Sequence, residues 1–302
     1  MRKPTLQKAE SQIVSWIEQQ EKKILKEKVL FSKLNEERVH WKLANYLTPA
    51  KIAGYLIEKG YLHKHVLTFA NKANPKAKQL NHIRYCFHEP NEWELIQSLG
   101  KEGYFSHSSA LFLHQLTEQV PKTLFFKLEN VVRKIAPKQA NLTQESINYA
   151  FQQVPRQTHY CANIGNYTVY QLAGHKTNGL GITSINYRGA IIQVTDIERT
   201  LIDIVVRPYY AGGIDEIIKA FQNALEIGIS VNKLGNYLRK LDYIYPYHQA
   251  IGFYMEQAGN YRPAQIDILR KMERHFDFYL MNQMVDMEYD PTWRLFYPKG
   301  LR

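Results

Sequence analysis

Cysteine is nearly absent from this sequence, and long apolar runs are absent altogether. Cys86 and Cys161 are the only two cysteines in 302 residues, too few for a disulfide framework, so we expect free thiols in a reducing compartment. No apolar run approaches the ~18 residues of a membrane span, and the N-terminus lacks the apolar core of a secretory signal. These absences predict a cytoplasmic protein with no membrane partner.

Motifs of common enzymes are also missing. Gly212-Gly213 lacks both the glycine spacing and the following Lys-Ser/Thr that cradle a nucleotide phosphate. The sequence has no Gly-x-Ser-x-Gly turn, no His-Glu-x-x-His helix and no Cys-x-x-Cys pair. We therefore expect no enzymatic activity, no cofactor and no bound metal.

Two weaker alternatives stay open. Glu198 and Asp203 could hold a metal in an enzyme that acts on nucleic acid, although their spacing on a helix separates their directions by about 140°. A capped and salt-bridged helix start is the simpler interpretation. The second alternative is a zinc site across a predicted hairpin, with ligands drawn from His63, His65, His82, Cys86 and His88. Their spacing matches no common zinc pattern.

Positive charge is concentrated in the first third of the chain. Residues 1–90 hold 17 Lys and Arg against 8 Asp and Glu, whereas residues 91–302 hold 22 against 20. A local excess of this kind suits nucleic acid, because phosphate contacts are the main source of affinity there. A solvated lysine-rich surface is the plain alternative. The apolar content of 45% predicts a chain folded nearly throughout, and its length suits two domains.

The pattern of the first 90 residues predicts a winged helix-turn-helix. Helices are expected within 6–25, 33–43 and 48–59, the third opened by Thr48 as N-cap and Pro49 at its first position. Strand-like runs at 61–69 and 82–87 flank a lysine-rich stretch and predict a basic hairpin. Three helices followed by a hairpin is the order of a winged helix, whose third helix enters the major groove. An ordinary α+β domain is the alternative.

Candidate DNA-binding residues follow from this prediction. Lys51, Tyr55 and Lys59 form a stripe along the third helix, and a base contact is expected from Tyr55 or Lys51. Lysines of the helix and the hairpin are expected to contact phosphates. The full candidate set is Thr48, Lys51, Tyr55, Lys59, Lys64, Lys72, Lys76, Lys78 and Arg84.

Residues 91–302 predict a larger mixed α/β domain. Short helices are expected at 107–116 and 143–151 and a strand at 123–128, followed between 158 and 195 by a small antiparallel sheet built from hairpins. Helices then dominate to the C-terminal end, with ranges 197–206 (capped by Asp196), 214–226, 230–241, 248–258 and 263–284. The predicted fold class is α+β with domains 1–90 and 91–302, the second divisible into a sheet-rich part, 91–195, and a helical part, 196–302.

Scattered motifs between about residues 100 and 260 point to one family. They are Ser106-His107-Ser108-Ser109-Ala110-Leu111, Leu116-Thr117-Glu118-Gln119-Val120-Pro121, Val194-Thr195-Asp196-Ile197-Glu198-Arg199-Thr200-Leu201-Ile202-Asp203, Arg207-Pro208, Ala211-Gly212-Gly213 and Ala250-Ile251-Gly252-Phe253-Tyr254-Met255-Glu256-Gln257-Ala258-Gly259. Together they resemble the AbiEi family, the antitoxins of bacterial type IV toxin–antitoxin systems, which act in abortive infection and phage defence. The motif that contains Asp196 is the most specific.

The resemblance implies a function for each domain. An N-terminal winged-helix domain would bind operator DNA, often at inverted repeats, with self-association on the DNA, and would repress its own operon. The C-terminal domain would neutralise a nucleotidyltransferase-like toxin encoded next door, directly or indirectly. Glu198, Arg199 and Arg207 are candidates for the antitoxin surface. A stand-alone winged-helix transcriptional regulator without a toxin partner is the alternative.

Overall fold

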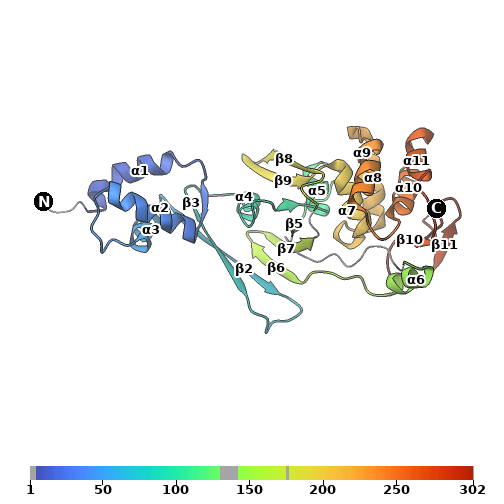
Figure 1. Ribbon diagram of the computed structural model, residues 1–302, viewed down its shortest axis with the longest axis horizontal. Helices are drawn as coiled ribbons and strands as arrows, with labels where there is room; N and C mark the ends of the chain where they lie inside the picture. Colours follow the sequence, from blue (N-terminus) through green and yellow to red (C-terminus); the bar gives the residue numbers. More distant parts are fainter. Residues whose placement is uncertain (1–4, 130–141, 175–176, 302) are drawn as a thin grey trace. The chain divides into compact units, whose positions relative to one another are not determined.

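The chain has a mixed α+β fold and divides into two compact units. A computed structural model describes residues 5–129, 142–174 and 177–301 (Figure 1). Unit 1 comprises Met1–Lys101, Tyr160–Asn166 and Arg188–Ala190, and unit 2 comprises Glu102–His159, Tyr167–Tyr187 and Ile191–Arg302. The domain boundary expected between residues 90 and 91 stays a prediction.

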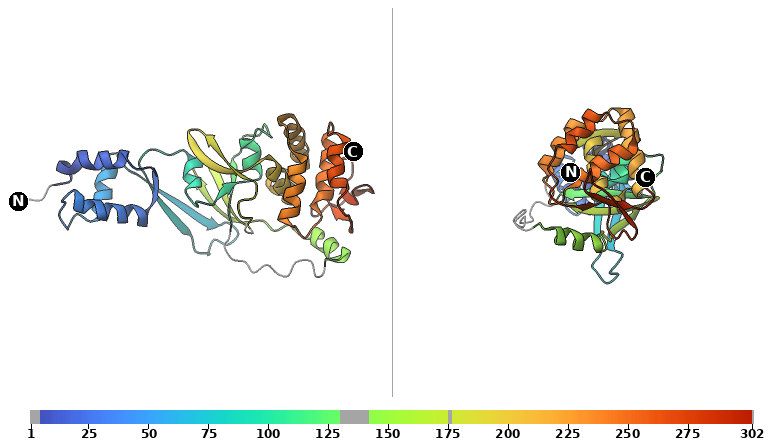
Figure 2. Two further views of the ribbon diagram at one scale, coloured as in Figure 1. Left: turned by 45° about the horizontal axis from the view of Figure 1, so that its top comes forward. Right: turned by 90° about the vertical axis from the view of Figure 1, so that its right-hand side faces the viewer.

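Unit 1 combines short helices with four strands. Its elements are η1 (Gln7–Ala9), α1 (Glu10–Glu18), β1 (Ile24–Lys26), α2 (Glu27–His40), α3 (Pro49–Glu58), β2 (His63–Asn71), β3 (Leu80–Cys86), α4 (Glu92–Gln97) and β6 (Tyr160–Ile164). β2 and β3 form a long antiparallel hairpin (Figure 2). β1 pairs antiparallel with β3, and β6 pairs with the end of β2 at Ala70, so the strand order is β1-β3-β2-β6.

Apolar side chains from α1, α2 and α3 build the core of the N-terminal part of unit 1. Ile13 of α1, Leu34 of α2 and Leu56 of α3 are fully buried in one cluster, which Tyr85 of β3 joins. Three helices in this region were expected, although α1 and α2 have different bounds. Strand β1 was not expected, because a strand of three residues has no recognisable alternation.

The strands of unit 2 form a mixed arrangement. They are β4 (Tyr104–Phe105), β5 (Thr123–Glu129), β7 (Tyr167–Gly174), β8 (Ile182–Tyr187) and β9 (Ala190–Thr195), in the order β7-β5-β4-β9-β8. β5 pairs with β7 in parallel, and β4 pairs with β9 in parallel. The expected hairpin of β8 and β9 is present, with its turn at 188–189, but the arrangement is mixed and not antiparallel throughout. The cause of the difference is non-local: β4 and β5 insert between strands that come later in the chain.

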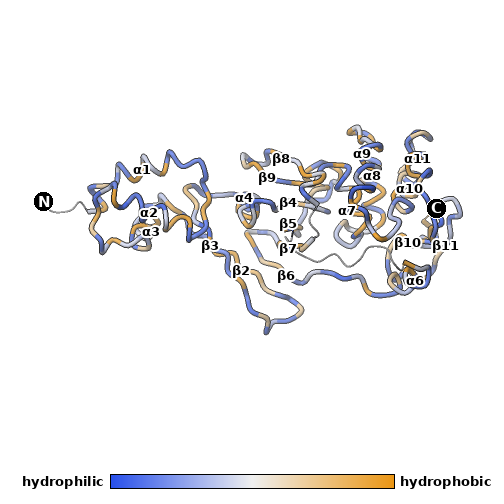
Figure 3. The backbone as a smooth tube through the Cα atoms, viewed as in Figure 1, coloured by the Kyte–Doolittle hydropathy of each residue, from blue (hydrophilic) through white to orange (hydrophobic). Residues whose placement is uncertain are grey.

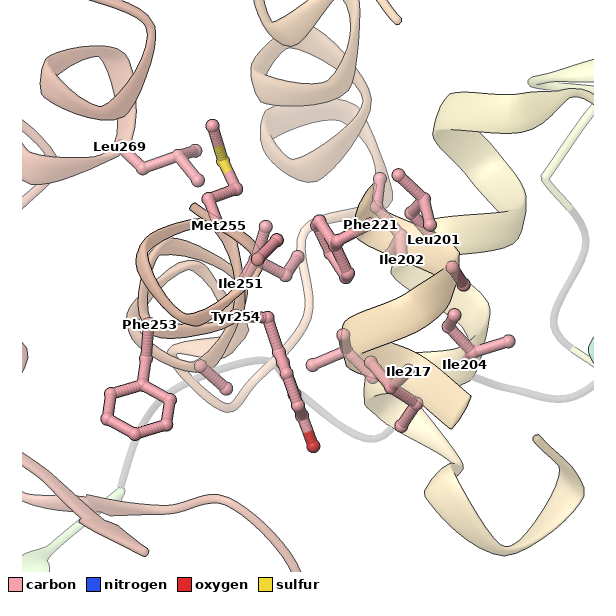
Figure 4. Packing of buried hydrophobic residues seen from close by; sticks show 14 of the residues in the cluster. Leu201, Ile202, Ile204, Ile217, Phe221, Ile251, Phe253, Tyr254, Met255 and Leu269 are labelled. Carbon is pink, nitrogen blue, oxygen red and sulfur yellow. The ribbon is translucent and has the colours of Figure 1, made fainter. Parts of the chain in front are cut away.

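Helices cover much of the rest of unit 2. They are α5 (Ser108–Leu113), α6 (Gln144–Gln152), α7 (Ile197–Val206), η2 (Pro208–Tyr210), α8 (Ile214–Ile227), α9 (Val231–Leu241), α10 (Tyr247–Ala258) and α11 (Pro263–Arg270). The core joins α7, α8, α10 and α11, where Ile202, Phe221 and Ile251 are fully buried (Figure 4). Most of these helices match the expected ranges, and α6, α7 and α9 start at recognisable caps, Thr143, Asp196 and Ser230.

The C-terminal end is a small sheet, which corrects the expected helical end. The helix expected over 263–284 stops at Arg270, and β10 (Phe278–Tyr279), β11 (Met287–Asp290) and β12 (Leu295–Pro298) follow in the order β10-β12-β11. The Phe278 N–H donates to the Arg294 carbonyl at 2.8 Å, and the Arg294 guanidinium donates to Asp277 at 2.9 Å. Strand pairing with residues further along the chain thus replaces the last turns of the helix.

Hydrophobic and hydrophilic segments alternate along the chain without a long uniform apolar stretch (Figure 3). Within the residues that the structure describes, no helix has the length and apolar character needed to cross a bilayer. Cys86 and Cys161 are both free and buried.

Candidate nucleic-acid interface and the C-terminal motif site

Helix α3 has one buried and one exposed side. The Thr48 hydroxyl accepts a hydrogen bond from the Lys51 N–H at 3.4 Å, and Pro49 occupies the first turn, so the helix begins where the sequence predicted. Ile52 and Leu56 point into the core of unit 1 with no exposed surface. Lys51 therefore lies on the solvent side, at the N-terminal end of the helix.

The predicted stripe of Lys51, Tyr55 and Lys59 is only partly exposed to solvent. Lys51 and Lys59 are exposed, but the Tyr55 hydroxyl donates to Glu10 Oε2 at 2.7 Å, and the Tyr61 hydroxyl donates to Oε1 at 3.0 Å. These two hydrogen bonds lower the pKa of Glu10, and the bond to Glu10 raises the pKa of Tyr55 to about 12. The base contact assigned to Tyr55 is corrected, because its hydroxyl is committed to joining α3 with α1.

The lysines of the hairpin lie at the surface. Lys64 on β2 and the three lysines of the β2–β3 loop, Lys72, Lys76 and Lys78, are exposed. The loop is shaped by Asn71, whose side-chain oxygen accepts from the N–H groups of Ala73 and Asn74 at 2.9 and 3.2 Å. Their position suits contacts with a phosphate backbone.

Arg84 was expected on this surface, and the structure corrects that expectation. The side chain is 3% exposed. Its Nε and Nη2 donate to the Ser98 carbonyl at 3.2 and 2.9 Å, and its Nη1 donates to the Ile83 carbonyl at 2.9 Å. Burial lowers the pKa of the guanidinium. Arg84 therefore ties β3 to the segment that follows α4, and it is not available to a phosphate.

Histidines in and near the hairpin contact glutamates. His63 Nδ1 and His65 Nε2 lie 3.0 and 3.8 Å from the carboxylate of Glu89, and His88 Nε2 lies 2.8 Å from that of Glu94. Burial raises the pKa of Cys86 to about 12, which opposes the thiolate that zinc requires. In the described parts of the chain, no group of three His, Cys, Asp or Glu side chains is arranged to hold a metal ion.

Asp196 and Glu198 anchor α7 to α9. Asp196 caps α7 by accepting from the Arg199 N–H at 2.9 Å, and it also accepts from the Tyr237 hydroxyl at 2.8 Å. Glu198 accepts from the Ser230 N–H at 3.0 Å and from Lys233 Nζ at 2.8 Å. Desolvation acts to raise the pKa of Glu198, but these two hydrogen bonds outweigh it, and the pKa is lowered. The carboxylates therefore join two helices.

Arg199 and Asp203 form a buried ion pair along α7. Arg199 has no exposed surface, and its Nε donates to Asp203 Oδ1 at 2.9 Å while Nη1 donates to the Leu180 carbonyl at 2.8 Å. Arg199 and the nearly buried Glu198 are thus corrected as antitoxin-surface residues. Arg207, at the end of α7, stays exposed. Glu198 and Asp203 serve different ion pairs, which is the arrangement of a structural helix and not of a shared metal site.

Two neighbouring motifs, 106–111 and 116–121, meet a distant one, 211–213, around one groove of about 290 Å³. Its lining includes Ser108 and Leu111 of the first motif, Thr117 and Val120 of the second, and Gly212 of a later one. The Thr117 hydroxyl donates to Glu216 at 2.9 Å, which fastens the second motif to α8. The sequence offered no signal for this contact between residues so far apart.

His107 is a buried polar residue whose role was not recognised in the sequence. It has a positive φ of 55° at the start of α5, and its Nδ1 lies 2.8 Å from the Ser106 hydroxyl. Burial lowers the pKa of His107 to about 3, so the ring is neutral at physiological pH. It is a structural member of the first motif.

Comparison with known proteins gives a likeness of fold. No known family and no curated protein matches the sequence. The chain is similar to the crystal structure of the RV2827C protein from Mycobacterium tuberculosis, with 14% sequence identity and a TM-score of 0.54. The match covers 98% of this chain and 92% of that one. At this identity, the conclusion is that the two proteins share a fold.

Proposed function

We propose that this protein is a non-catalytic DNA-binding antitoxin that also represses its own operon. The observation that carries the proposal is the order α1-β1-α2-α3-β2-β3 in unit 1, with β1 and β2 both paired to β3. A winged helix-turn-helix has this order, and its third helix enters the major groove of double-stranded DNA. Helix α3, with its Thr48 cap and exposed Lys51, is the proposed recognition helix.

Charge supports the choice of nucleic acid as the partner. The excess of 17 Lys and Arg over 8 Asp and Glu lies in residues 1–90, and Lys51, Lys59 and Lys64 are exposed around the proposed recognition helix and hairpin. Release of counterions from DNA gives such a surface affinity without any sequence preference. Self-association on inverted repeats would double the number of phosphate contacts.

The antitoxin role rests on the resemblance of the motifs in unit 2 to the AbiEi family. Residues of three of those motifs line the groove that contains Ser108, Thr117 and Gly212, so the motifs form one continuous region of unit 2. Because Glu198 and Arg199 are buried, we place the proposed toxin-neutralising surface around the exposed Arg207. The proposed target is a nucleotidyltransferase-like toxin, acted on directly or indirectly in the cytoplasm.

Replacing two lysines tests the DNA-binding part of the proposal. The double variant Lys51→Ala/Lys59→Ala should weaken binding to the DNA upstream of its own gene. The slope of log affinity against log salt should become less steep by about 2, since each lost phosphate contact contributes about 0.9. Fluorescence anisotropy across a salt series measures both quantities.

The matched control is Lys240→Ala/Lys271→Ala, which removes the same charge from exposed positions of unit 2. It should leave the salt slope unchanged. Equal losses in the two variants would mean that net charge, and not the proposed recognition helix, determines binding.

The genomic neighbourhood separates the proposal from a stand-alone transcriptional regulator, which shares the same unit 1. An adjacent reading frame that halts growth when expressed alone, and is rescued by this protein, supports the antitoxin. An enzyme acting on nucleic acid would instead require magnesium-dependent cleavage that Glu198→Gln abolishes.

A further inference from the structure

Tyr46 is an exposed aromatic side chain directly before the proposed recognition helix. It lies between α2 and α3 and is 66% exposed, while Leu43 and Leu47 on either side are buried. These two leucines fix the segment so that Tyr46 is held outward. The Lys51 ammonium lies 5.6 Å from the centroid of the Tyr46 ring. An aromatic face and a cation are thus presented together at the N-terminal end of α3.

Gly54 lies in the middle of α3 on the exposed side. A Cβ atom built on it would meet nothing within 4 Å, and its φ is not positive, so neither crowding nor backbone conformation requires glycine here. Glycine inside a helix costs stability relative to alanine. Ala50, one turn earlier, is also small and exposed. The exposed side of α3 therefore has no long side chain at positions 50 and 54.

Both features lower the stability of the isolated protein, and no contact among the described residues of unit 1 requires a glycine at position 54. An exposed tyrosine leaves apolar surface in water, and an unforced helical glycine loosens the helix. Residues that lower the stability of a protein, and that its own packing does not require, are typical of a contact with another molecule. The exposed lysines at positions 42, 51 and 59 make a polyanion the fitting partner.

We infer that the face made by Tyr46, Lys51 and Gly54 is the part of unit 1 that docks on double-stranded DNA. This rests on the proposed DNA-binding function and replaces the stripe through Tyr55. Gly54 lets the helix axis approach the groove more closely than any side chain would allow. Tyr46 contacts the DNA with its ring, and Lys51 contacts a phosphate beside it.

Two substitutions test this face by anisotropy on duplexes that tile the DNA upstream of its own gene. Gly54→Ala should raise the melting temperature by a few degrees and yet weaken DNA binding at least tenfold. Tyr46→Ala should weaken binding to a similar extent, whereas Tyr46→Phe, which keeps the ring, should bind as the wild type does. Tyr149→Ala, at a position of unit 2 that is 67% exposed, is the control and should change nothing.

The outcomes separate this inference from the function on which it rests. If the wild type binds DNA and both Gly54→Ala and Tyr46→Ala bind it as tightly as the wild type does, this face of α3 is not the docking surface. The DNA-binding function is then still supported. If the wild type binds none of the duplexes, the proposed function fails and the inference fails with it. Gain of stability with loss of binding in Gly54→Ala is the result that supports the inference.

Discussion

At the scale of single residues, unit 2 contains a buried pair of opposite charges in α7. Arg199 and Asp203 lie side by side in α7 with almost no exposed surface. One oxygen of Asp203 and one nitrogen of Arg199 have no hydrogen-bond partner among residues 5–129, 142–174 and 177–301. Desolvation acts to raise the pKa of Asp203, but the neighbouring Arg199 outweighs it, and the pKa is lowered. The charge of Lys127 acts on the pKa of Asp203 in the same direction, so two cations stabilise this buried carboxylate, and Arg199 also donates a hydrogen bond to it.

Removing one member of this pair should lower the free energy of unfolding. Arg199→Ala removes the hydrogen-bonded partner of the buried Asp203 carboxylate, and we expect a loss of about 3–5 kcal/mol in the free energy of unfolding. Urea denaturation measures this loss. Arg239→Ala, at an exposed position of α9, should change stability by no more than about 0.5 kcal/mol. Similar stabilities for the two variants would contradict the importance of the pair.

A buried histidine should make stability depend on pH. The folded state keeps His107 neutral down to a pKa of about 3, whereas the unfolded chain protonates it near its ordinary pKa of about 6.5. The unfolded state thus binds more protons between these values, so stability falls as the pH falls. His248, whose pKa burial lowers to about 4, acts in the same direction.

Substitution of His107 isolates its share of this effect. Between pH 7 and pH 5, where most carboxylates stay ionised, His107→Gln should flatten the dependence of stability on pH by up to about 1.4 kcal/mol per pH unit. Urea denaturation at several pH values provides the slopes. His159→Gln, which changes an exposed histidine, should keep the wild-type slope; an equal flattening there would rule out the explanation by burial.

At the scale of elements, the same substitution should have opposite effects in two helices. A Cβ on Gly252 of α10 would clash with the buried Trp293 ring, while a Cβ on Gly54 of α3 would meet no described atom within 4 Å. Gly252→Ala should therefore lower the free energy of unfolding by about 1–3 kcal/mol through overpacking. Thermal unfolding of both variants checks the contrast, and an unchanged Gly252→Ala would mean that Trp293 can move aside.

Several elements could be predicted because their signals are local. Thr48, Thr143, Asp196 and Ser230 each cap the helix expected to follow them, since a side-chain oxygen of this kind satisfies a free N–H nearby in sequence. The strand β5 was predicted in the same way, from the residue types within its own short segment. The mixed order of β4 and β5 could not be predicted, because it depends on pairing between distant segments.

At the scale of the whole molecule, the two proposed activities should separate. In full-length protein, Lys51→Ala/Lys59→Ala should lose repression of its own promoter but still rescue growth from the adjacent toxin. The reason is that both lysines lie in unit 1, whereas the family-like motifs lie in unit 2. A promoter–reporter assay and a growth assay in the same strain measure the two activities. Loss of rescue together with repression would contradict this division of labour.

The sequence by itself determined the uneven charge, the helix caps and the absence of a disulfide framework, because these depend on composition or on neighbours within a few residues. Only the tertiary structure decided which polar groups are available. It buried Arg84 and Arg199 and turned the Tyr55 hydroxyl toward Glu10. It also left Tyr46 and Gly54 bare. The sequence does not show whether a charged side chain faces water or a buried carbonyl. That depends on packing between segments far apart in the chain.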